Sequence, residues 1–227
     1  ALLRQNLPPE ILLHYAMKAN PMPAVVQHLA GLVDGIDVAS AGEMRIALDT
    51  ILPPNSISFA GPGKKEHELR SAIAAGIVLN VESDQEMELI AQLGEFLGIT
   101  PKVAIRVNPD FELKSSGMKM SGGSKPFGVD AECVPDLLMR LRKLGLNFIG
   151  FHIFSGSQNL NAAAIQETHA KTFQLGIQLA DYAPSPVCLL NIGGGFGVPY
   201  FPGDKALDLA FIGENLRCLM PEVKRQL

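Results

Sequence analysis

The sequence has few of the features that mark exported, membrane-bound or nucleic-acid-binding proteins. Its three cysteines, Cys133, Cys188 and Cys218, are widely spaced and form no CxxC pair, so they suggest neither a disulfide framework nor a zinc site. No apolar run approaches the roughly 18 residues of a membrane span, and residues 1–10 lack a signal peptide's hydrophobic core. A net charge of −4 without a basic stripe argues against nucleic acid or an anionic membrane surface as partner. We therefore expect a cytoplasmic protein, without a metal, that binds a small molecule.

The composition is that of a folded α/β domain. With 227 residues, 47% of them hydrophobic, the chain can bury a sizeable core, and we expect one domain over residues 1–227. Short aliphatic runs recur along it and predict seven strands. These are Leu12–Ala16, Ile36–Ser40, Ser56–Ala60, Ile77–Val81, Val103–Val107, Phe148–Phe154 and Val187–Ile192.

Helical patterns separate these runs. Apolar residues after Asn20 are spaced for one helix face, and Gly35 is expected to end that helix. Ser40 with Glu43, and Ser83 with Glu86, have the spacing of a capping box at the next two helix starts. The order of elements is therefore strand, helix, strand, helix.

Apolar strands that alternate with helices indicate a parallel sheet covered on both faces. A barrel and a doubly wound sheet both fit this pattern. Seven βα units without a visible break in strand order favour a (β/α)8 barrel that lacks one unit. The ends of the sequence agree, since the first residues resemble the tail of a helix and 216–227 hold no further strand.

Lys18 is the most informative residue. It follows an apolar strand, at the end where α/β proteins build their active sites. A surface lysine on a loop and an amine that forms a Schiff base both fit this position. Other residues change the balance, because polar groups stand at the same end of several predicted strands. They are Asp37, Ser40, Arg106, His152, Ser155 and the glycines Gly193, Gly194 and Gly195.

Each of these groups also has a structural interpretation. His152 lies inside an apolar strand, where it is either a core histidine or a ring that stacks on an aromatic cofactor. Arg106 is costly to bury without a carboxylate or phosphate partner. Glu43 is best explained as a helix cap. The three glycines could form a tight turn or a phosphate cradle, since the sequence has neither a GxGxxG nor a GxxxxGK[ST] fingerprint.

Two connections are longer than a helix requires. Asn108–Val129 is rich in glycine, serine and lysine, and we interpret it as an active-site loop that orders on ligand binding. Ser155–Asn161 could supply hydroxyl and amide groups to a ligand.

Taken in order, eight motifs resemble the fold-type III pyridoxal phosphate decarboxylases, which include ornithine, arginine and diaminopimelate decarboxylases. Within that family the chain is most similar to the bacterial branch associated with exosortase and exopolysaccharide gene clusters, and also to decarboxylases of carrier-bound amino acids. The motifs cover nearly the whole chain. They are HYAMKAN, GIDVASAGEM, FAGPGK, NVES, AIRVNP, KPFGVD, GFHIFSGSQ and LNIGGGFG.

The resemblance implies a fold of the alanine racemase type and a site for pyridoxal 5′-phosphate. It implies that Lys18 holds the cofactor as a Schiff base, that His152 stacks on the ring, and that Ser155 with Gly193–Gly195 contacts the phosphate. Asp37 and Arg106 match polar positions of the same site. The implied activity is decarboxylation of a diamino acid or a carrier-bound amino acid, as in polyamine or lysine biosynthesis, by a homodimer in the full-length protein.

Two features of the family are missing from these residues. They are the glutamate–proline–glycine–arginine segment of the last barrel strand and the C-terminal β domain with its cysteine, for which Cys218 is no substitute. We therefore expect most of the barrel of a longer enzyme, inactive by itself. Two alternatives stay open at this point, an amino-acid racemase of the same barrel superfamily and a noncatalytic protein that binds pyridoxal phosphate.

Overall fold

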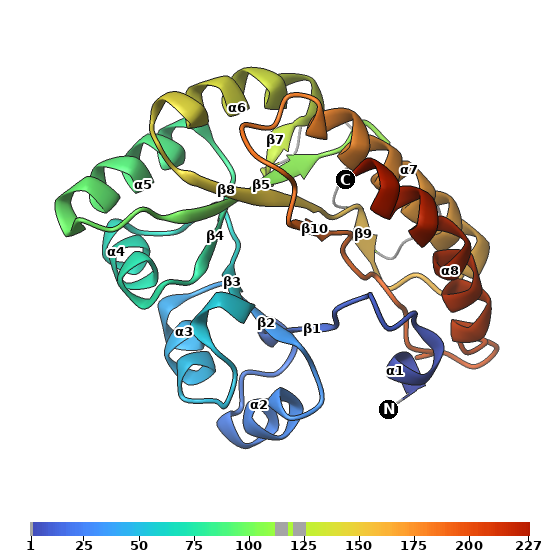
Figure 1. Cartoon of the computed structure of the whole chain (residues 1–227). Coiled ribbons are helices and arrows are strands. Elements are labelled where there is room, and N and C mark those ends of the chain that lie inside the picture. Colours follow the sequence, from blue (N-terminus) through green and yellow to red (C-terminus); the bar gives the residue numbers. More distant parts are fainter. Residues whose placement is uncertain (1, 112–117, 120–125) are drawn as a thin grey trace.

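The computed structural model describes residues 2–111, 118–119 and 126–227. Its centre is a sheet in which all strand pairings are parallel (Figure 1). All seven strands predicted from the sequence are present, shorter at their ends than predicted in most cases. They are β1 (His14–Ala16), β2 (Gly35–Val38), β3 (Ile57–Phe59), β4 (Val78–Val81), β5 (Lys102–Asn108), β8 (Asn147–Ile153) and β10 (Leu189–Asn191).

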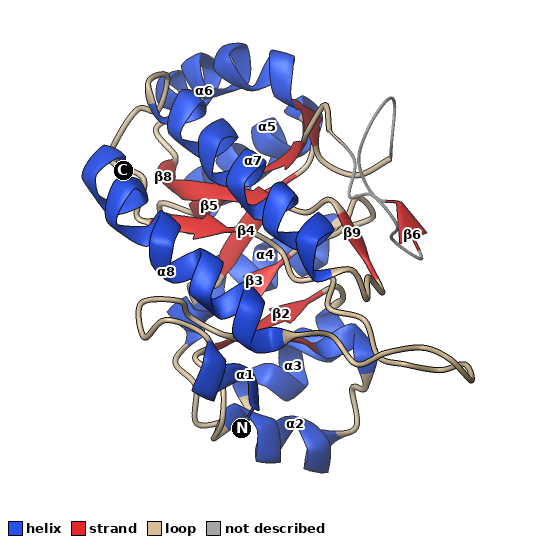
Figure 2. Ribbon diagram, turned by 90° about the vertical axis from the view of Figure 1, so that its right-hand side faces the viewer, coloured by secondary structure: helices blue, strands red, loops and turns tan. Residues whose placement is uncertain are grey.

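Helices surround the curled sheet on its outer side (Figures 1 and 2). Most of them connect one parallel strand to the next, as βα units require. The helices are α1 (Leu2–Asn6), α2 (Pro23–Ala30), α3 (Ala41–Leu48), α4 (Glu66–Ala75), α5 (Asp84–Leu97), α6 (Val134–Lys143), α7 (Ala162–Ala180) and α8 (Leu209–Gln226).

The strand order distinguishes a barrel from a doubly wound sheet. Neighbours in the sheet follow one another along the chain, in the order β1-β2-β3-β4-β5-β8-β10, without a reversal. A doubly wound sheet would reverse its order at a switch point. The prediction of an incomplete barrel is therefore confirmed.

The two faces of the strands differ in chemistry. Ile36 and Val38 of β2 belong to the apolar core beneath the helices, whereas Asp37 between them hydrogen-bonds to Ser58 of β3. Because side chains alternate along a strand, one face is apolar and the other is polar. The prediction of a sheet covered by helices on both faces is therefore wrong. The inner face, which we call the lumen, carries a row of polar side chains instead.

Local signals at the helix ends explain where the elements start and stop. The Ser40 hydroxyl accepts the Glu43 N–H at 3.2 Å and the Glu43 carboxylate accepts the Ala39 N–H at 2.7 Å, so the predicted cap of α3 is confirmed. The prediction that Gly35 ends the preceding helix is wrong, because α2 ends at Ala30. Gly35 begins β2, where a Cβ atom would lie 2.4 Å from the Ser56 carbonyl oxygen.

A second apolar cluster joins the two ends of the chain. Helices α7 and α8 pack side by side, and α1 packs on α8 (Figures 1 and 2). The Arg217 guanidinium of α8 donates to the Asn6 carbonyl at 2.7 Å, and Lys224 pairs with Glu10 at 2.9 Å. Among the described helices, none combines the length and apolarity that crossing a membrane would require.

Short strands lie around the predicted active-site loop. β7 (Val129–Asp130) pairs with the end of β5, and β6 (Met118–Lys119) pairs with β9 (Gly156–Ser157). Most of the loop Asn108–Val129 lies outside the described residues, so its ordering on ligand binding stays a prediction.

Gly150 fixes the path of β8 toward the site. Its φ is +153°, the register with β5 shifts beside it, and a Cβ atom would lie 1.7 Å from the Leu189 carbonyl oxygen. That oxygen belongs to the neighbouring strand β10, which cannot retreat without breaking the sheet. Because Gly150 has no side chain, β8 and β10 can pair at this position, which is two residues before His152.

Replacing Gly150 with alanine should lower the free energy of unfolding by about 3 kcal/mol or more, measured by urea denaturation. Gly145 is the matched control, because its φ is also positive, at +66°, but no atom lies near its Cβ position. Gly145→Ala should cost only about 1 kcal/mol. Equal costs at the two positions would mean that the contact with Leu189 is unimportant.

Candidate active site

The residues predicted to form a site lie where the strands of the sheet end. Lys18 lies on the turn Met17–Ala19 directly after β1. Arg106 and His152 are Cα partners on the adjacent strands β5 and β8, near their carboxyl ends. Gly193–Gly195 follow β10. The parallel sheet thus brings residues that are distant in sequence to one edge.

Lys18 is presented by a turn that its neighbours hold in place. Met17 is fully buried, and the Tyr15 hydroxyl donates to the Asn20 carbonyl oxygen at 2.9 Å. The Lys18 side chain is exposed, with its Nζ 5.9 Å from the centre of the Phe154 ring, at the end of β8. The amine is therefore accessible, and it faces the strand end that carries His152.

Asp37 is the acceptor of a hydrogen-bond chain across the lumen. The Asn80 amide donates to the Ser58 hydroxyl at 3.1 Å, and that hydroxyl donates to Asp37 Oδ1 at 2.8 Å. His14 Nδ1 lies 3.0 Å from the same oxygen. Burial alone would raise the pKa of Asp37, but the hydrogen bond and charge of His14 outweigh it and lower this pKa. Although burial opposes it, the same pair raises the pKa of His14.

His152 is buried and neutral at physiological pH. Burial, followed by the positive charge of Arg106, lowers its pKa to about 4, against the opposing influence of Asp37 and Glu82. Its Nδ1 has no hydrogen-bond partner in the part of the chain that the structure describes. The imidazole therefore offers an uncharged, flat ring in the lumen.

Arg106 has the anionic partner that its burial demands. Its guanidinium donates a hydrogen bond to Glu82 at 3.0 Å, and the central carbon of the guanidinium, Cζ, lies 5.0 Å from the centre of the Phe127 ring. Lys64 lies 3.9 Å from the Glu82 carboxylate and 2.8 Å from that of Glu86. Of the two partners predicted for Arg106, a carboxylate or a phosphate, the protein itself supplies the carboxylate.

Two segments at the end of the sheet are joined by the side chain of Gln158. Its amide donates to the Val198 carbonyl at 2.6 Å and accepts the Val198 N–H at 3.1 Å. The side chain thus makes the pair of hydrogen bonds that the backbone of a neighbouring strand would make. The Asn159 N–H donates to the Gly195 carbonyl at 2.8 Å. The segment that begins at Ser155 therefore fixes the glycine turn that follows β10.

The glycine turn has the backbone freedom that a phosphate cradle needs. Gly193 and Gly195 have φ values of +73° and +81°. A Cβ atom on Gly193 would lie 2.7 Å from the Phe154 ring, whereas the Cβ position of Gly194 is open. A small cavity of about 10 Å³, with space for about one water molecule, is lined by Ser155 and Gly194 among others.

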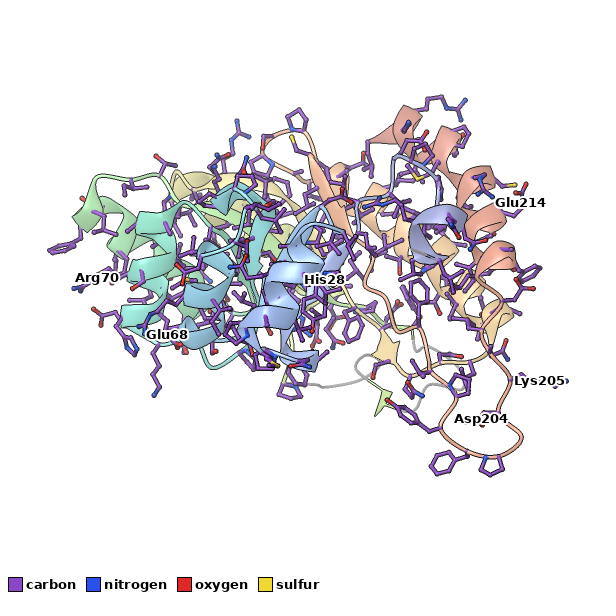
Figure 3. The ribbon with its side chains drawn as sticks, turned by 90° about the horizontal axis from the view of Figure 1, so that it is seen from below. His28, Glu68, Arg70, Asp204, Lys205 and Glu214 are labelled. Atoms are coloured by element: carbon purple, nitrogen blue, oxygen red, sulfur yellow. The ribbon has the colours of Figure 1, made fainter. Side chains whose placement is uncertain are left out.

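Beyond the turn, residues 198–207 form a loop that projects from the body of the molecule, with Asp204 and Lys205 on it (Figure 3). Tyr200 and Phe201 are about three-quarters exposed there. Gly193–Gly195 themselves are partly exposed.

The structure places close together most of the residues that the sequence assigned to the site. Phe154 lies beside both Lys18 and Gly193, and the pKa of His152 responds to Lys18, Asp37 and Arg106. Ser40 is used as the cap of α3.

Sequence reasoning missed five residues that support the site: His14, Ser58, Lys64, Asn80 and Glu82. A signal for Glu82 existed, because Asn80 and Glu82 are separated by one residue at the end of an apolar strand, a spacing that directs both to one face. Lys64 and Glu82 also lie within the motifs FAGPGK and NVES, to which no role had been given.

Comparison with known proteins matches residues 1–226 to the family described as pyridoxal-dependent decarboxylase, pyridoxal binding domain. The chain is 37% identical to the L-glutamyl-[BtrI acyl-carrier protein] decarboxylase of Niallia circulans, over 98% of this chain and 52% of that protein. It is 35% identical to a diaminopimelate decarboxylase of Aquifex aeolicus, over 96% of this chain and 53% of that protein.

Among solved structures, the chain is similar to diaminopimelate decarboxylase from Helicobacter pylori complexed with L-lysine. The TM-score is 0.83 at 26% identity, and the match covers 96% of this chain and 56% of that one. The chain thus spans about half the length of the relatives that it matches.

The lowered pKa of His152 predicts a loss of stability in acid. Between pH 6.5 and about 4 the unfolded chain binds a proton on this residue and the folded chain does not, so stability falls as the pH falls through that range. His152→Phe should remove up to about 3 kcal/mol of this loss, measured by urea denaturation of the cofactor-free protein.

His14 is the contrasting control, because its pKa is raised. Its pair with Asp37 contributes stability that is fully present below pH 6.5 and is lost as the pH rises through the raised folded pKa. His14→Gln should therefore remove a loss of stability above pH 6.5 and leave the slope between pH 6.5 and 4 unchanged. If His14→Gln flattened the acid loss as His152→Phe should, the assignment of these two charge states would be wrong.

Proposed function

The chain belongs to the pyridoxal-dependent decarboxylases, whose pyridoxal-binding domain it matches over residues 1–226, and from this premise we propose that it carries the cofactor site of an amino-acid decarboxylase. The observation that supports the proposal best is the convergence of Lys18, His152 and the glycine turn on Phe154 and the strand ends around it. The cofactor of this family is pyridoxal 5′-phosphate.

The residues at this edge fit the three parts of that cofactor. Lys18 offers an exposed amine for an aldehyde. His152 offers a flat neutral ring whose Nδ1 has no partner within the described residues, which suits stacking on a pyridine. Gly194, with an open Cβ position between two glycines of positive φ, suits close approach of a phosphate to backbone N–H groups.

When bound, pyridoxal phosphate supplies an electron sink that stabilises the electron pair left on a substrate carbon as carbon dioxide departs. In our proposal the residues of this chain bind, orient and move protons around it. Lys18 would hold the cofactor through its Nζ, and the same amine would serve as a proton donor or acceptor beside it. Gly193–Gly195 and Ser155 bind the phosphate.

The polar residues of the lumen set the electrostatic conditions. His152 stays uncharged because burial and Arg106 lower its pKa to about 4, so its ring face can lie against the cofactor without an added charge. Asp37 keeps a negative charge through its hydrogen bonds with Ser58 and His14. Arg106, fixed by Glu82, places a positive charge beside His152.

The substrate class is part of the proposal. Relatives of the chain act on diaminopimelate or on glutamate held by an acyl-carrier protein, according to their names. We therefore propose a diamino acid or a carrier-bound amino acid as the substrate. Homodimerisation of the full-length protein, a cytoplasmic location and membership of the exosortase-associated branch stay predictions.

The assignment of Lys18 is tested by borohydride reduction of the protein after incubation with pyridoxal phosphate, followed by peptide mass spectrometry. We expect about one fixed adduct per chain, on the peptide that contains Lys18, because that amine is exposed and lies beside Phe154 at the end of the strand that carries His152. Lys18→Ala should remove the adduct. Lys205→Ala, which changes an exposed lysine on the projecting loop, should leave it in place.

An adduct spread over several lysines, or retained in Lys18→Ala, would contradict the assignment. Circular dichroism of Lys18→Ala should match that of the unchanged protein, since an exposed side chain on a turn contributes little packing.

The phosphate site is tested by Gly194→Ala. The new methyl group has space in the fold, because no atom lies within 4 Å of its position, but it obstructs an anion at the backbone N–H groups. Affinity for pyridoxal phosphate should fall about tenfold or more, while affinity for pyridoxal, which lacks the phosphate, should stay the same. Equal losses for both compounds would contradict a phosphate role for this turn.

A further inference from the structure

Four charged side chains form a buried cluster to which the proposed function gives no common role. We call Lys64, Glu82, Glu86 and Arg106 the charge cluster; their side chains are 1%, 2%, 10% and 9% exposed. It contains two cations and two carboxylates, so its formal charge is balanced. Taking such groups out of water costs several kcal/mol each, and apolar residues could fill the same space. Filling this space with four charged side chains therefore costs more free energy than filling it with apolar ones, so packing alone does not explain the cluster.

Glu82 is the centre of this cluster. Its Oε1 accepts hydrogen bonds from the Arg106 guanidinium and from the Gly61 N–H, and its Oε2 accepts one from the Gly128 N–H at 3.2 Å. Gly61 follows β3, and Gly128 leads into β7. One carboxylate therefore connects Arg106 to two loops at the edge of the sheet where the site lies.

Lys64 secures the other side of Glu82. Its Nζ donates to the carbonyls of Gly61 and Asn80 at 2.6 and 2.9 Å, and it pairs with Glu86 at 2.8 Å. These bonds fix the ammonium 3.9 Å from Glu82, so that its charge balances the carboxylate. Glu86 contacts Lys64 and accepts the Glu82 N–H at 2.8 Å, and within the described part of the chain it makes no hydrogen bond to Arg106.

Arg106 is held on two sides. Glu82 lies at 3.0 Å from one nitrogen of its guanidinium, and the Phe127 ring lies 5.0 Å from its centre. A guanidinium is planar and has five N–H donors in a fixed fork, so fixing one edge also fixes the direction of the others. The backbone beneath it is constrained as well, since a Cβ atom on Gly128 would lie 2.7 Å from the Arg106 carbonyl oxygen.

We propose that Glu82 is a positioning residue, which holds the Arg106 guanidinium beside His152 in the orientation from which it binds an oxyanion of the cofactor or of the amino acid. This inference rests on the proposed function. Glu82 acts through Arg106, and Lys64 balances its charge. The two sources of the oxyanion are distinguished by where the loss appears when Glu82 is changed.

The first variant is Glu82→Gln, in the protein expressed from its complete gene. The amide is close to the carboxylate in shape, but its NH₂ group would face an N–H donor, either of Arg106 and Gly61 or of Gly128. We expect kcat/KM to fall about tenfold or more. A matching rise in the Kd for pyridoxal phosphate would show that Arg106 binds an oxyanion of the cofactor. A rise in KM for the amino acid, with the Kd for pyridoxal phosphate unchanged, would show that Arg106 binds an oxyanion of the amino acid.

A double-mutant cycle with Arg106→Met separates positioning from a general structural role. If Glu82 acts through Arg106, then Glu82→Gln should change kcat/KM and cofactor affinity less than about twofold once Arg106 is methionine. Glu86→Gln is the matched control, because it makes the same charge change beside the same lysine without touching Arg106. It should change kcat/KM less than about threefold.

Three results would overturn the inference: an unchanged kcat/KM in Glu82→Gln, additive effects in the cycle, or equal losses in Glu82→Gln and Glu86→Gln. If Glu82→Gln does not fold, the double variant Glu82→Gln/Arg106→Met is compared with Arg106→Met instead, because neither of these two proteins contains an unpaired guanidinium. A double variant more than about threefold worse than Arg106→Met would also overturn it. The unchanged protein is measured first, since failure of Lys18 to bind the cofactor there contradicts the proposed function instead.

Discussion

The alternation of side chains along parallel strands is the constraint on which the site depends. Ile36, Val38 and their counterparts on neighbouring strands point to the helices, so Asp37, Ser58 and Asn80 must point to the lumen. Sequential strand order then places these polar residues next to one another. The same pairing that builds the apolar core therefore also builds a polar lining, and neither could change register alone, because a shift by one residue would exchange the two faces.

The lining contains more charge than an interior normally tolerates. Arg106 is paired with Glu82, Asp37 with His14, and His152 remains neutral instead of taking up a proton. Each arrangement reduces the free energy that burial of a charge would cost. Lys18 differs from them, because its amine is exposed on a turn held by buried Met17. The lumen thus provides a fixed electrostatic background beside the accessible amine of Lys18.

The fold could be predicted closely from the sequence, because long-range order here follows from local patterns. Seven apolar runs and the caps at Ser40 and Ser83 define the βα units, and their number without a break favoured the barrel. Lys18, Arg106 and His152 could be placed because each ends or interrupts an apolar strand. Lys64 and His14 could not, since their roles come from contacts between strands and loops distant in sequence, to Glu82 and Asp37. The end of α2 was misplaced because Gly35 is required by packing against Ser56 and not by helix termination.

Product analysis tests the central claim most directly, because the racemases of the same barrel superfamily would share the cofactor and its lysine. The protein expressed from its complete gene would be incubated with pyridoxal phosphate and amino acids labelled at the α-carboxylate, including a diamino acid and an acyl-carrier-bound glutamate. Our account predicts release of labelled carbon dioxide and of the corresponding amine in equal amounts from one of these substrates. Formation of the opposite enantiomer with the label retained would contradict decarboxylation.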